Sequence, residues 1–325
     1  MRINKISITP EGLPIELFFK DSSAPSQLNR TVLALGTFDG VHTAHRALIT
    51  GARELAGRLS ASHTGVWCFE ESPAQVLSGD DEALLTTKEE KVSLLLDGGI
   101  DFVAMGSFSD FKNLSAEDFI DNVLKKGLGC IGTVSGYDHR FGHKGLGNSE
   151  TLSNAFGSEN TVSVNEIRLG NEKIGSSSIR NHLLLGELEL ANAMLERKFS
   201  VTSRVTEGKR LGRKLGFPTA NQPYPIKKAP LKRGVYATLC KIEGGQTYIG
   251  VTNVGTRPSI SAGDDHILNC ETYIVDFSGD VYGKEMKLEF HKFIREEKKF
   301  PSLEELTAAI SADTEKTVAY FAEKK

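Results

Sequence analysis

The pattern of apolar residues changes near residue 200, and this change limits the possible folds more than any other feature. Before it, buried-strand patterns such as TVLALG at 31–36 alternate with helical patterns such as HRALITGARELAGRL at 45–59. This order is typical of a parallel sheet covered by helices. After it, β-branched runs follow one another between glycine and charged turns, which predicts an antiparallel barrel or sandwich. We therefore expect two domains, residues 1–184 and 185–325.

The length agrees with this division, because 325 residues exceed what one hydrophobic core usually spans. A capping box of Ser302 and Glu305 after Pro301 predicts a helix at the end of the second domain. In the first domain we expect strands at 31–36, 64–69, 100–106 and 131–136, and helices at 45–59, 88–99, 115–127 and 177–197. In the second we expect strands at 200–207, 234–242, 246–255, 267–277 and 284–294.

The composition excludes several classes of protein. With 39% hydrophobic residues, the chain has enough apolar side chains to fold, and it lacks the roughly 18 consecutive apolar residues of a membrane helix. Its N-terminal residues do not form a secretory signal, and its four cysteines form no CxxC pair. These features predict a cytoplasmic protein with reduced thiols and no membrane partner.

The charge argues against a nucleic-acid partner, because the net charge is −3. Residues 207–233 nevertheless hold eight basic residues against one acidic residue. Such a cluster could be a phosphate site, a polynucleotide patch or solvated surface. The sequence carries no signal of oligomeric state.

Two glycine-rich segments resemble nucleotide-binding motifs only superficially. Residues 127–132 match GxGxxG, but they join the end of a helix to a strand, whereas a dinucleotide motif follows a strand and opens a helix. Residues 212–216 lack the Gly-Lys-Ser/Thr ending of a Walker A loop. Neither segment predicts a nucleotide site of those classes.

The segment GTFDGVHTAH at 36–45 has a context suited to chemistry. It joins the carboxyl end of a buried strand to a helix start, where α/β sheets bind ligands and backbone N–H groups favour phosphate. His42 and His45 lie three residues apart on the first helical turn and can face one point. They could bind a phosphoryl group, cap and solvate the helix, or form part of a metal site.

Further segments along the chain resemble one known family. They are LTTK at 85–88, GYDHRFG at 136–142, IGSSSIR at 174–180, the glycine-spaced GKRLGRKLGFPTAN at 208–221, GVYA at 234–237, NVGTRP at 253–258 and FIREEKKF at 293–300. Together with GTFDGVHxxH, a nucleotidylyltransferase-like signature, they occur in the order of the bacterial bifunctional riboflavin kinase/FAD synthetase family. The resemblance implies an N-terminal Rossmann-like nucleotidylyltransferase domain and a C-terminal antiparallel β-barrel kinase domain with a terminal helix.

In the first domain, the resemblance implies adenylylation of FMN by Mg²⁺-ATP, with release of pyrophosphate. His42 and His45 would be catalytic and bind ATP phosphates. The other implied ATP and phosphate ligands are Gly36, Phe38, Asp39, Ser176, Ser177 and Arg180, and the implied flavin ligands are Asp138, Arg140 and Phe141. Where the family usually has glycine, phenylalanine, serine and glycine, this chain has Ala44, His139, Gly175 and Glu196.

In the second domain, the resemblance implies phosphorylation of riboflavin by ATP. Thr219 and Asn221 offer hard oxygen ligands for Mg²⁺, and Glu271 would be the general base for the ribityl hydroxyl. The implied phosphate-binding residues are Gly208, Lys209, Gly212, Arg213 and Gly216, and Arg295 is an implied flavin ligand. Without the resemblance, Glu271 would be interpreted as a rim glutamate in an ion pair, and the lysines and arginines as surface charge.

Two other functions remain open on the sequence. One is a riboflavin kinase whose first domain has lost adenylylation. The other is a non-catalytic protein that binds or senses flavin. The intact Thr219, Asn221 and Glu271 favour an enzyme with both activities, acting on ATP, riboflavin and FMN.

Overall fold

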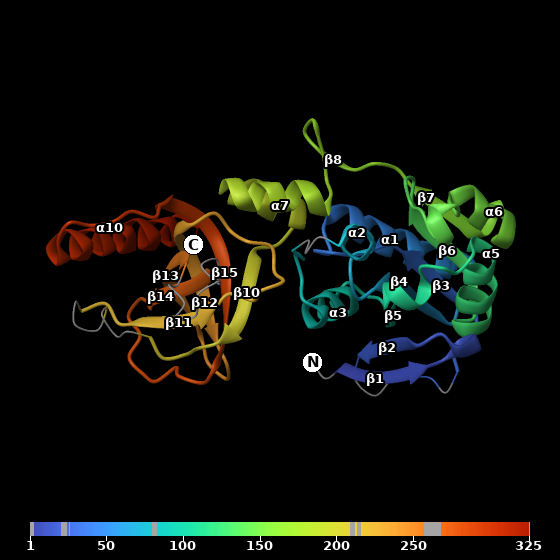
Figure 1. Ribbon diagram of the computed structural model, residues 1–325, viewed down its shortest axis with the longest axis horizontal. Helices are drawn as coiled ribbons and strands as arrows, with labels where there is room; N and C mark the ends of the chain where they lie inside the picture. The colour runs from blue at the N-terminus through green and yellow to red at the C-terminus, as the bar shows by residue number, and fades with distance from the viewer. Residues whose placement is uncertain are drawn as a thin grey trace. The chain divides into compact units, whose positions relative to one another are not determined.

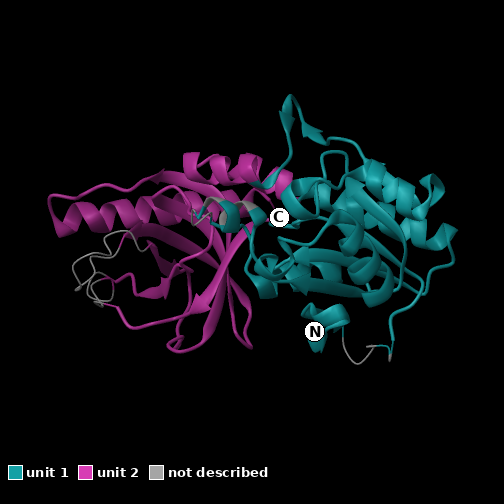
Figure 2. Cartoon of the chain, turned by 45° about the vertical axis from the view of Figure 1, so that its right-hand side comes forward, with its two compact units in different colours: residues 1–176 teal, residues 177–325 magenta. Residues whose placement is uncertain are grey.

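The computed structural model describes residues 3–20, 25, 27–79, 83–208, 212, 216–256 and 268–324. Contacts within the chain divide it into two compact units, residues 1–176 and 177–325 (Figure 2). This division falls at the start of helix α7 (Ser176–Leu185), whereas the boundary expected from the sequence lies near the end of that helix.

Unit 1 contains a seven-stranded sheet in the order β1-β2-β5-β4-β3-β6-β7 (Figure 1). The strands β3 to β7 pair in parallel, and β1 and β2 add an antiparallel edge. The bounds are β1 Ile3–Ile8, β2 Ile15–Lys20, β3 Thr31–Leu35, β4 His63–Phe69, β5 Phe102–Gly106, β6 Cys130–Gly136 and β7 Thr161–Val164. The strand order reverses between β3 and β6, and such a switch point is where α/β sheets bind ligands at the carboxyl ends of their strands.

Helices cover both faces of this sheet. Val32 and Ala34 of β3 pack with residues of α1 and α3 on one face, and Leu33 and Leu35 pack with the 119–124 segment on the other. The helices are α1 Thr43–Arg58, α2 Pro73–Ser78, α3 Lys88–Asp97, α4 Phe108–Phe111, α5 Ala116–Asp118 and α6 Ser149–Phe156, with a π-helical continuation at Phe119–Gly127 and short 3₁₀ turns at Pro10–Gly12, His143–Gly145 and Ser158–Asn160. Burial on both faces explains why these strands have nearly continuous apolar sequences.

The structure confirms the expected fold class and differs from the sequence prediction in detail. The sheet is mixed, because β2 pairs antiparallel with both β1 and β5. The β1–β2 hairpin was not predicted. The single helix expected at 177–197 is two helices, α7 and α8 (Leu188–Leu195), separated at Gly186. A small hairpin of β8 (Arg168–Leu169) and β9 (Glu172–Lys173) precedes α7.

Unit 2 contains a six-stranded antiparallel sheet in the order β10-β15-β12-β13-β14-β11. A bridge between Thr206 and Asn221 brings the chain after β10 beside β11, so the sheet curls toward a barrel, as expected. The strands are β10 Phe199–Arg204, β11 Thr219–Pro223, β12 Gly234–Ile242, β13 Thr247–Thr256, β14 Leu268–Ile274 and β15 Glu285–Glu296.

The terminal helix α10 (Leu303–Ala322) packs against β12, β13 and β15. Its N-cap is Ser302, whose side chain accepts a hydrogen bond from the Glu305 backbone N–H, which is one half of the predicted capping box. All four cysteines are buried free thiols. Among the described residues, no helix has the length and hydropathy needed to cross a membrane.

Candidate active sites

The loop between β3 and α1 in unit 1 carries strained backbone. Phe38 and Val41 have φ angles of 53° and 41°, a left-handed region that is costly for a bulky or β-branched residue. Asp39 stabilises this loop, because its carboxylate accepts hydrogen bonds from the Leu85 and Thr86 backbone N–H groups at 2.8 and 3.2 Å. Ser176 Oγ adds a bond to the Asp39 carbonyl at 2.9 Å. The strain is thus balanced by contacts that fix the start of α1.

His42 and His45 face one another, as the spacing predicted. Their rings stack with centroids 3.7 Å apart, and Phe38 lies 4.9 Å from His45 on its other side. His42 is the residue before the first turn of α1, and both rings are largely buried. The strained loop therefore presents two stacked imidazoles at the N-terminus of a helix, where a phosphate is favoured.

Two predicted phosphate ligands of this loop have structural contacts of their own. Phe38 is fully buried in the core of unit 1, and Asp39 holds the 85–86 segment. Gly36 follows β3 directly. Their roles as ATP ligands stay predictions, and so do those of Ser177 and Arg180, whose side chains hydrogen-bond to each other at 3.3 Å in unit 2.

The loop after β6 lies on the other side of the switch point and holds the three predicted flavin residues. Asp138 forms an ion pair with Lys173 at 2.7 Å, and Arg140 is exposed. Phe141 packs on Phe119 in the core. Between them, burial lowers the pKa of His139 to about 4, although Asp138 acts in the opposite direction. At neutral pH His139 is therefore an uncharged ring, like the phenylalanine that it replaces.

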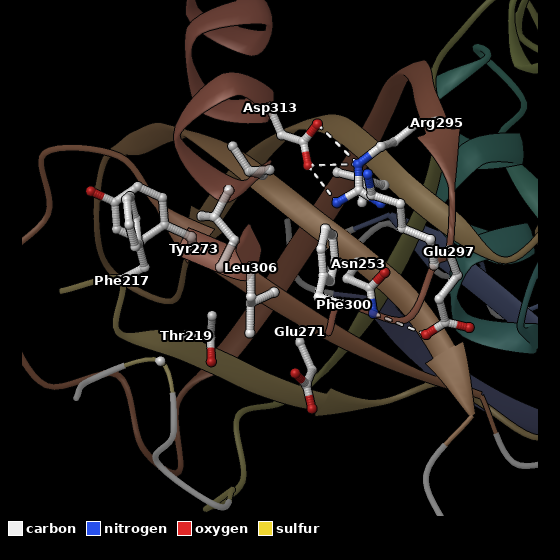
Figure 3. Close-up of a pocket in the computed structure, with 15 residues that line it drawn as sticks. Phe217, Thr219, Asn253, Glu271, Tyr273, Arg295, Glu297, Phe300, Leu306 and Asp313 are labelled. Carbon is white, nitrogen blue, oxygen red and sulfur yellow. Dashed lines mark hydrogen bonds and ion pairs between the residues drawn. The ribbon is translucent and has the colours of Figure 1, made fainter. Parts of the chain in front are cut away.

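Unit 2 contains a cavity of about 240 Å³ between the sheet and α10 (Figure 3). Thr219, Glu271 and Arg295, which were predicted from the sequence, line it together. Its apolar wall includes Phe217, Val235, Val251, Phe300, Leu306 and Ile310. A cavity with apolar walls and a few converging polar groups is typical of a small-molecule site.

Three polar residues of this cavity, Asn253, Glu271 and Arg295, belong to one row across five strands, which also contains Val235 and, outside the cavity lining, Asn221. Asn221 of β11 pairs with Glu271 of β14, and Glu271 pairs with Asn253 of β13. Asn253 pairs with Val235 of β12, which pairs with Arg295 of β15. Residues directly opposite one another project from the same face of a sheet. The side chains of these five paired residues thus lie on one surface of the sheet.

Thr219 and Asn221 fit a hard metal ion by their chemistry. They lie two residues apart on β11 and so share a face, and both offer side-chain oxygens. Among the described residues, Asn221 Oδ1 accepts one long side-chain hydrogen bond, of 3.4 Å, from Asn269 Nδ2. Gly208 lies against this amide, and a β-carbon there would collide with it. The close approach of Gly208 to Asn221 is compatible with a phosphate-bound Mg²⁺.

The remaining loop residues are only partly described. Gly212 lines the cavity, and Gly216 is exposed with a φ of 83°. Lys209 and Arg213 lie outside the described residues.

Sequence reasoning gave no role to five polar residues of the cavity, which are Asn253, Tyr273, Glu297, Lys298 and Asp313. Asn253 belongs to the NVGTRP segment, but only the strand register places it beside Glu271. Asp313 lies on α10 and binds Arg295. The only signal for it in the sequence is its spacing from Leu306 and Ile310, which puts the three residues on one helix face.

The two sites define a class of protein: a transferase in which an α/β unit with two stacked histidines at its switch point precedes a β-barrel unit with its own cavity. The sequence matches the FAD synthetase family over residues 24–178 and the riboflavin kinase family over residues 195–321. Residues 179–194, which include most of α7 and α8, lie between the two matches.

Curated relatives match nearly the whole chain. The bifunctional riboflavin kinase/FMN adenylyltransferase of Listeria monocytogenes is 36% identical over 90% of this chain and 92% of its own. That of Escherichia coli K12 is 36% identical over 90% and 92%. A solved structure described as a macrolide-efflux protein from Streptococcus pneumoniae is 27% identical, with a TM-score of 0.82 over 95% of this chain and 97% of that one. The chain belongs to the bifunctional riboflavin kinase/FMN adenylyltransferase family.

Proposed function

We propose that this chain phosphorylates riboflavin to FMN in unit 2 and adenylylates FMN to FAD in unit 1, with ATP as the donor in both reactions. The family membership supports both activities. The observation that carries the kinase assignment is the row of Asn221, Glu271, Asn253 and Arg295 on one face of the sheet.

In the kinase reaction, Glu271 would accept the proton of the ribityl hydroxyl as that oxygen attacks the γ-phosphorus of ATP. The side chain of Glu271 is exposed at the cavity, so a substrate can reach it. The apolar residues Phe300, Leu306 and Ile310 would cover the flavin ring and exclude water from the reacting groups.

Thr219 and Asn221 would hold a Mg²⁺ ion in this site. When bound, the ion neutralises charge on the ATP phosphates. Gly208, Lys209, Gly212, Arg213 and Gly216 would bind those phosphates, because a tightly folded glycine loop offers backbone N–H groups and the basic side chains offer charge.

In the adenylylation reaction, the FMN phosphate would attack the α-phosphorus of ATP and release pyrophosphate. His42 and His45 would donate hydrogen bonds to phosphate oxygens on which negative charge grows in the transition state. Gly36 would let the phosphates approach the backbone. Asp39 and Ser176 would stabilise the conformation of the loop through their hydrogen bonds. Asp138, Arg140 and Phe141, across the switch point, would contact the flavin.

A product analysis tests this function. The purified chain is incubated with riboflavin, ATP and Mg²⁺, and the flavins are separated by chromatography over time. We expect FMN to appear first and FAD to follow. FMN without FAD would indicate a kinase alone, and flavin binding without any FMN would indicate a non-catalytic binder. Because both reactions use ATP and the four cysteines are free thiols, we also propose a cytoplasmic location.

A further inference from the structure

Arg295 and Asp313 form a two-pronged ion pair at the wall of the unit 2 cavity (Figure 3). Arg295 Nε donates to both carboxylate oxygens of Asp313 at 3.1 and 3.0 Å, and Nη2 donates to Oδ2 at 2.7 Å. The side chain of Asp313 is 4% exposed and that of Arg295 is 23% exposed. The pair thus joins α10 to the end of β15.

The backbone and ring contacts of Arg295 fix it further. Phe300 lies under the guanidinium, 5.5 Å from its centre. Gly234, with a φ of 152°, packs so closely on the Arg295 carbonyl that a β-carbon there would collide with it. Arg295 is therefore held at its backbone by β12, on its flat face by Phe300 and along one edge by Asp313.

The bonds within the protein leave two N–H groups of the guanidinium for a ligand. Of its five N–H groups, Nε and one on Nη2 are used by Asp313, and one on Nη1 donates to the Glu296 carbonyl at 3.0 Å. One N–H remains on each terminal nitrogen, with no partner among the described residues. Two such donors can bind two oxygens of a carboxylate or phosphate, or donate together to one carbonyl oxygen.

The ion pair also determines which acceptor suits these two N–H groups. The carboxylate of Asp313 compensates the charge of Arg295, and the other charged residues of the lining are two glutamates, Glu271 and Glu297, and one lysine, Lys298. An arginine that attracts an anion is more effective without such a carboxylate along its edge. A charge-compensated guanidinium instead serves as a rigid pair of donors to a neutral group.

We propose that Asp313 is a positioning residue, which holds Arg295 so that its terminal N–H groups donate to a carbonyl oxygen of the flavin ring. This inference rests on the proposed kinase function of unit 2. It assigns to the C-terminal helix a part in substrate recognition, in addition to its packing on the sheet. Asp313 acts through Arg295 and does not touch the substrate.

Thr317 provides a matched control. It lies one turn after Asp313 on the same face of α10 and is also a fully buried polar residue, but it does not line the cavity. A change there disturbs the packing of α10 without changing Arg295. Thr317→Val should keep the KM values of the wild-type chain for riboflavin and ATP.

The test measures steady-state kinase kinetics of the full chain with riboflavin and ATP varied separately. Asp313→Asn keeps the shape of the side chain but removes its charge and one acceptor. We expect it to raise the KM for riboflavin by about tenfold or more, since small misplacements of a binding group have large effects. The KM for ATP should stay within about twofold. Arg295→Lys already removes the guanidinium, whose N–H groups bind both Asp313 and the ligand. In that background, Asp313→Asn should raise the riboflavin KM no further.

Three results would overturn the proposal. The first is a riboflavin KM unchanged by Asp313→Asn in an active chain. The second is an equal rise in the KM values for riboflavin and ATP. The third is a double variant whose rise in riboflavin KM is the product of the rises caused by Asp313→Asn and Arg295→Lys separately. If Asp313→Asn does not fold, Asp313→Glu keeps the carboxylate and shifts it by one methylene, and its riboflavin KM must then rise. A wild-type chain that forms no FMN would instead refute the proposed function.

Discussion

Asn221 and Glu271 lie directly opposite each other on the antiparallel strands β11 and β14. Their side chains therefore project from one face of the sheet, at the separation of a cross-strand pair. The amide proposed to bind Mg²⁺ and the carboxylate proposed to accept the proton are neighbours here, although fifty residues separate them in the sequence. This register is what turns two separate motifs into one candidate active site.

Replacing Glu271 by Gln tests the proton-accepting role. The amide keeps the shape of the side chain but cannot accept a proton, so FMN formation should fall by about 100-fold or more. FAD formation from added FMN, measured in the same preparation, should persist because it belongs to unit 1. The matched change Glu289→Gln on β15, outside the cavity, should leave FMN formation unchanged. Unaltered kinase activity in Glu271→Gln would remove this residue from the base role.

Replacing His45 by Ala tests the stacked imidazoles. The change removes one ring of the pair 3.7 Å apart and should lower FAD formation from FMN by about 100-fold, the usual loss for one donor to a charged transition state. Phosphorylation of riboflavin should be retained. His63 begins β4 at the opposite end of the sheet, and His63→Ala is the control. An equal loss of both activities in His45→Ala would show that the histidine is needed for folding.

The sequence predicted the layers of the fold well and their connections less well. Apolar periodicity located β3, α1 and five of the six strands of unit 2, because burial on one or two faces dictates it. It missed β11, whose sequence TANQP has a single apolar aliphatic residue. The β1–β2 hairpin was missed because β1 is mostly exposed and its sequence INKISI is only weakly alternating. The break between α7 and α8 was missed because the apolar spacing continues across Gly186.

The site residues also divide into those that local sequence predicts and those that depend on packing between distant segments. The spacing of His42 and His45 predicted their proximity, because three residues on a helix is a local relationship. Asn253 and Asp313 depend on strand register and helix docking, which are set by packing between distant segments. Within GTFDG, the sequence also cannot separate a residue that touches a ligand from one such as Asp39, which holds its loop to Leu85 and Thr86.

Glu196 offers a stability test that a departure from the family suggests. It ends α8 with a φ of 52°, in the left-handed region where glycine is free of strain and other residues are not. Glu196→Gly should therefore stabilise the chain by about 1 kcal/mol, measured by urea denaturation. Glu189 lies in the first turn of the same helix, and Glu189→Gly should destabilise by up to about 1 kcal/mol. A loss of stability in Glu196→Gly would mean that contacts of the glutamate outweigh its strain.

His291 predicts how the stability of the chain depends on pH. His291 lies on β15 and packs against the aromatic residues Tyr320 and Phe321 of α10. This burial lowers its pKa from 6.5 to about 4. Lys198 and Lys324 lower it further, while Glu289 acts in the opposite direction. Between these two pKa values the unfolded chain binds a proton that the folded chain does not, so stability must fall as the pH falls from about 6.5 toward 4.

His291→Phe isolates this contribution. The phenyl ring keeps the aromatic contacts, and the buried Nε2 atom that it removes has no hydrogen-bond partner among the described residues. Free energies of unfolding from urea titrations at pH 7 and pH 5 give the loss of stability on acidification for each protein. This loss should be smaller in the variant by on the order of 1 kcal/mol, after allowance for partial solvent screening. An identical loss in both proteins would mean that His291 becomes protonated as readily in the folded chain as in the unfolded chain.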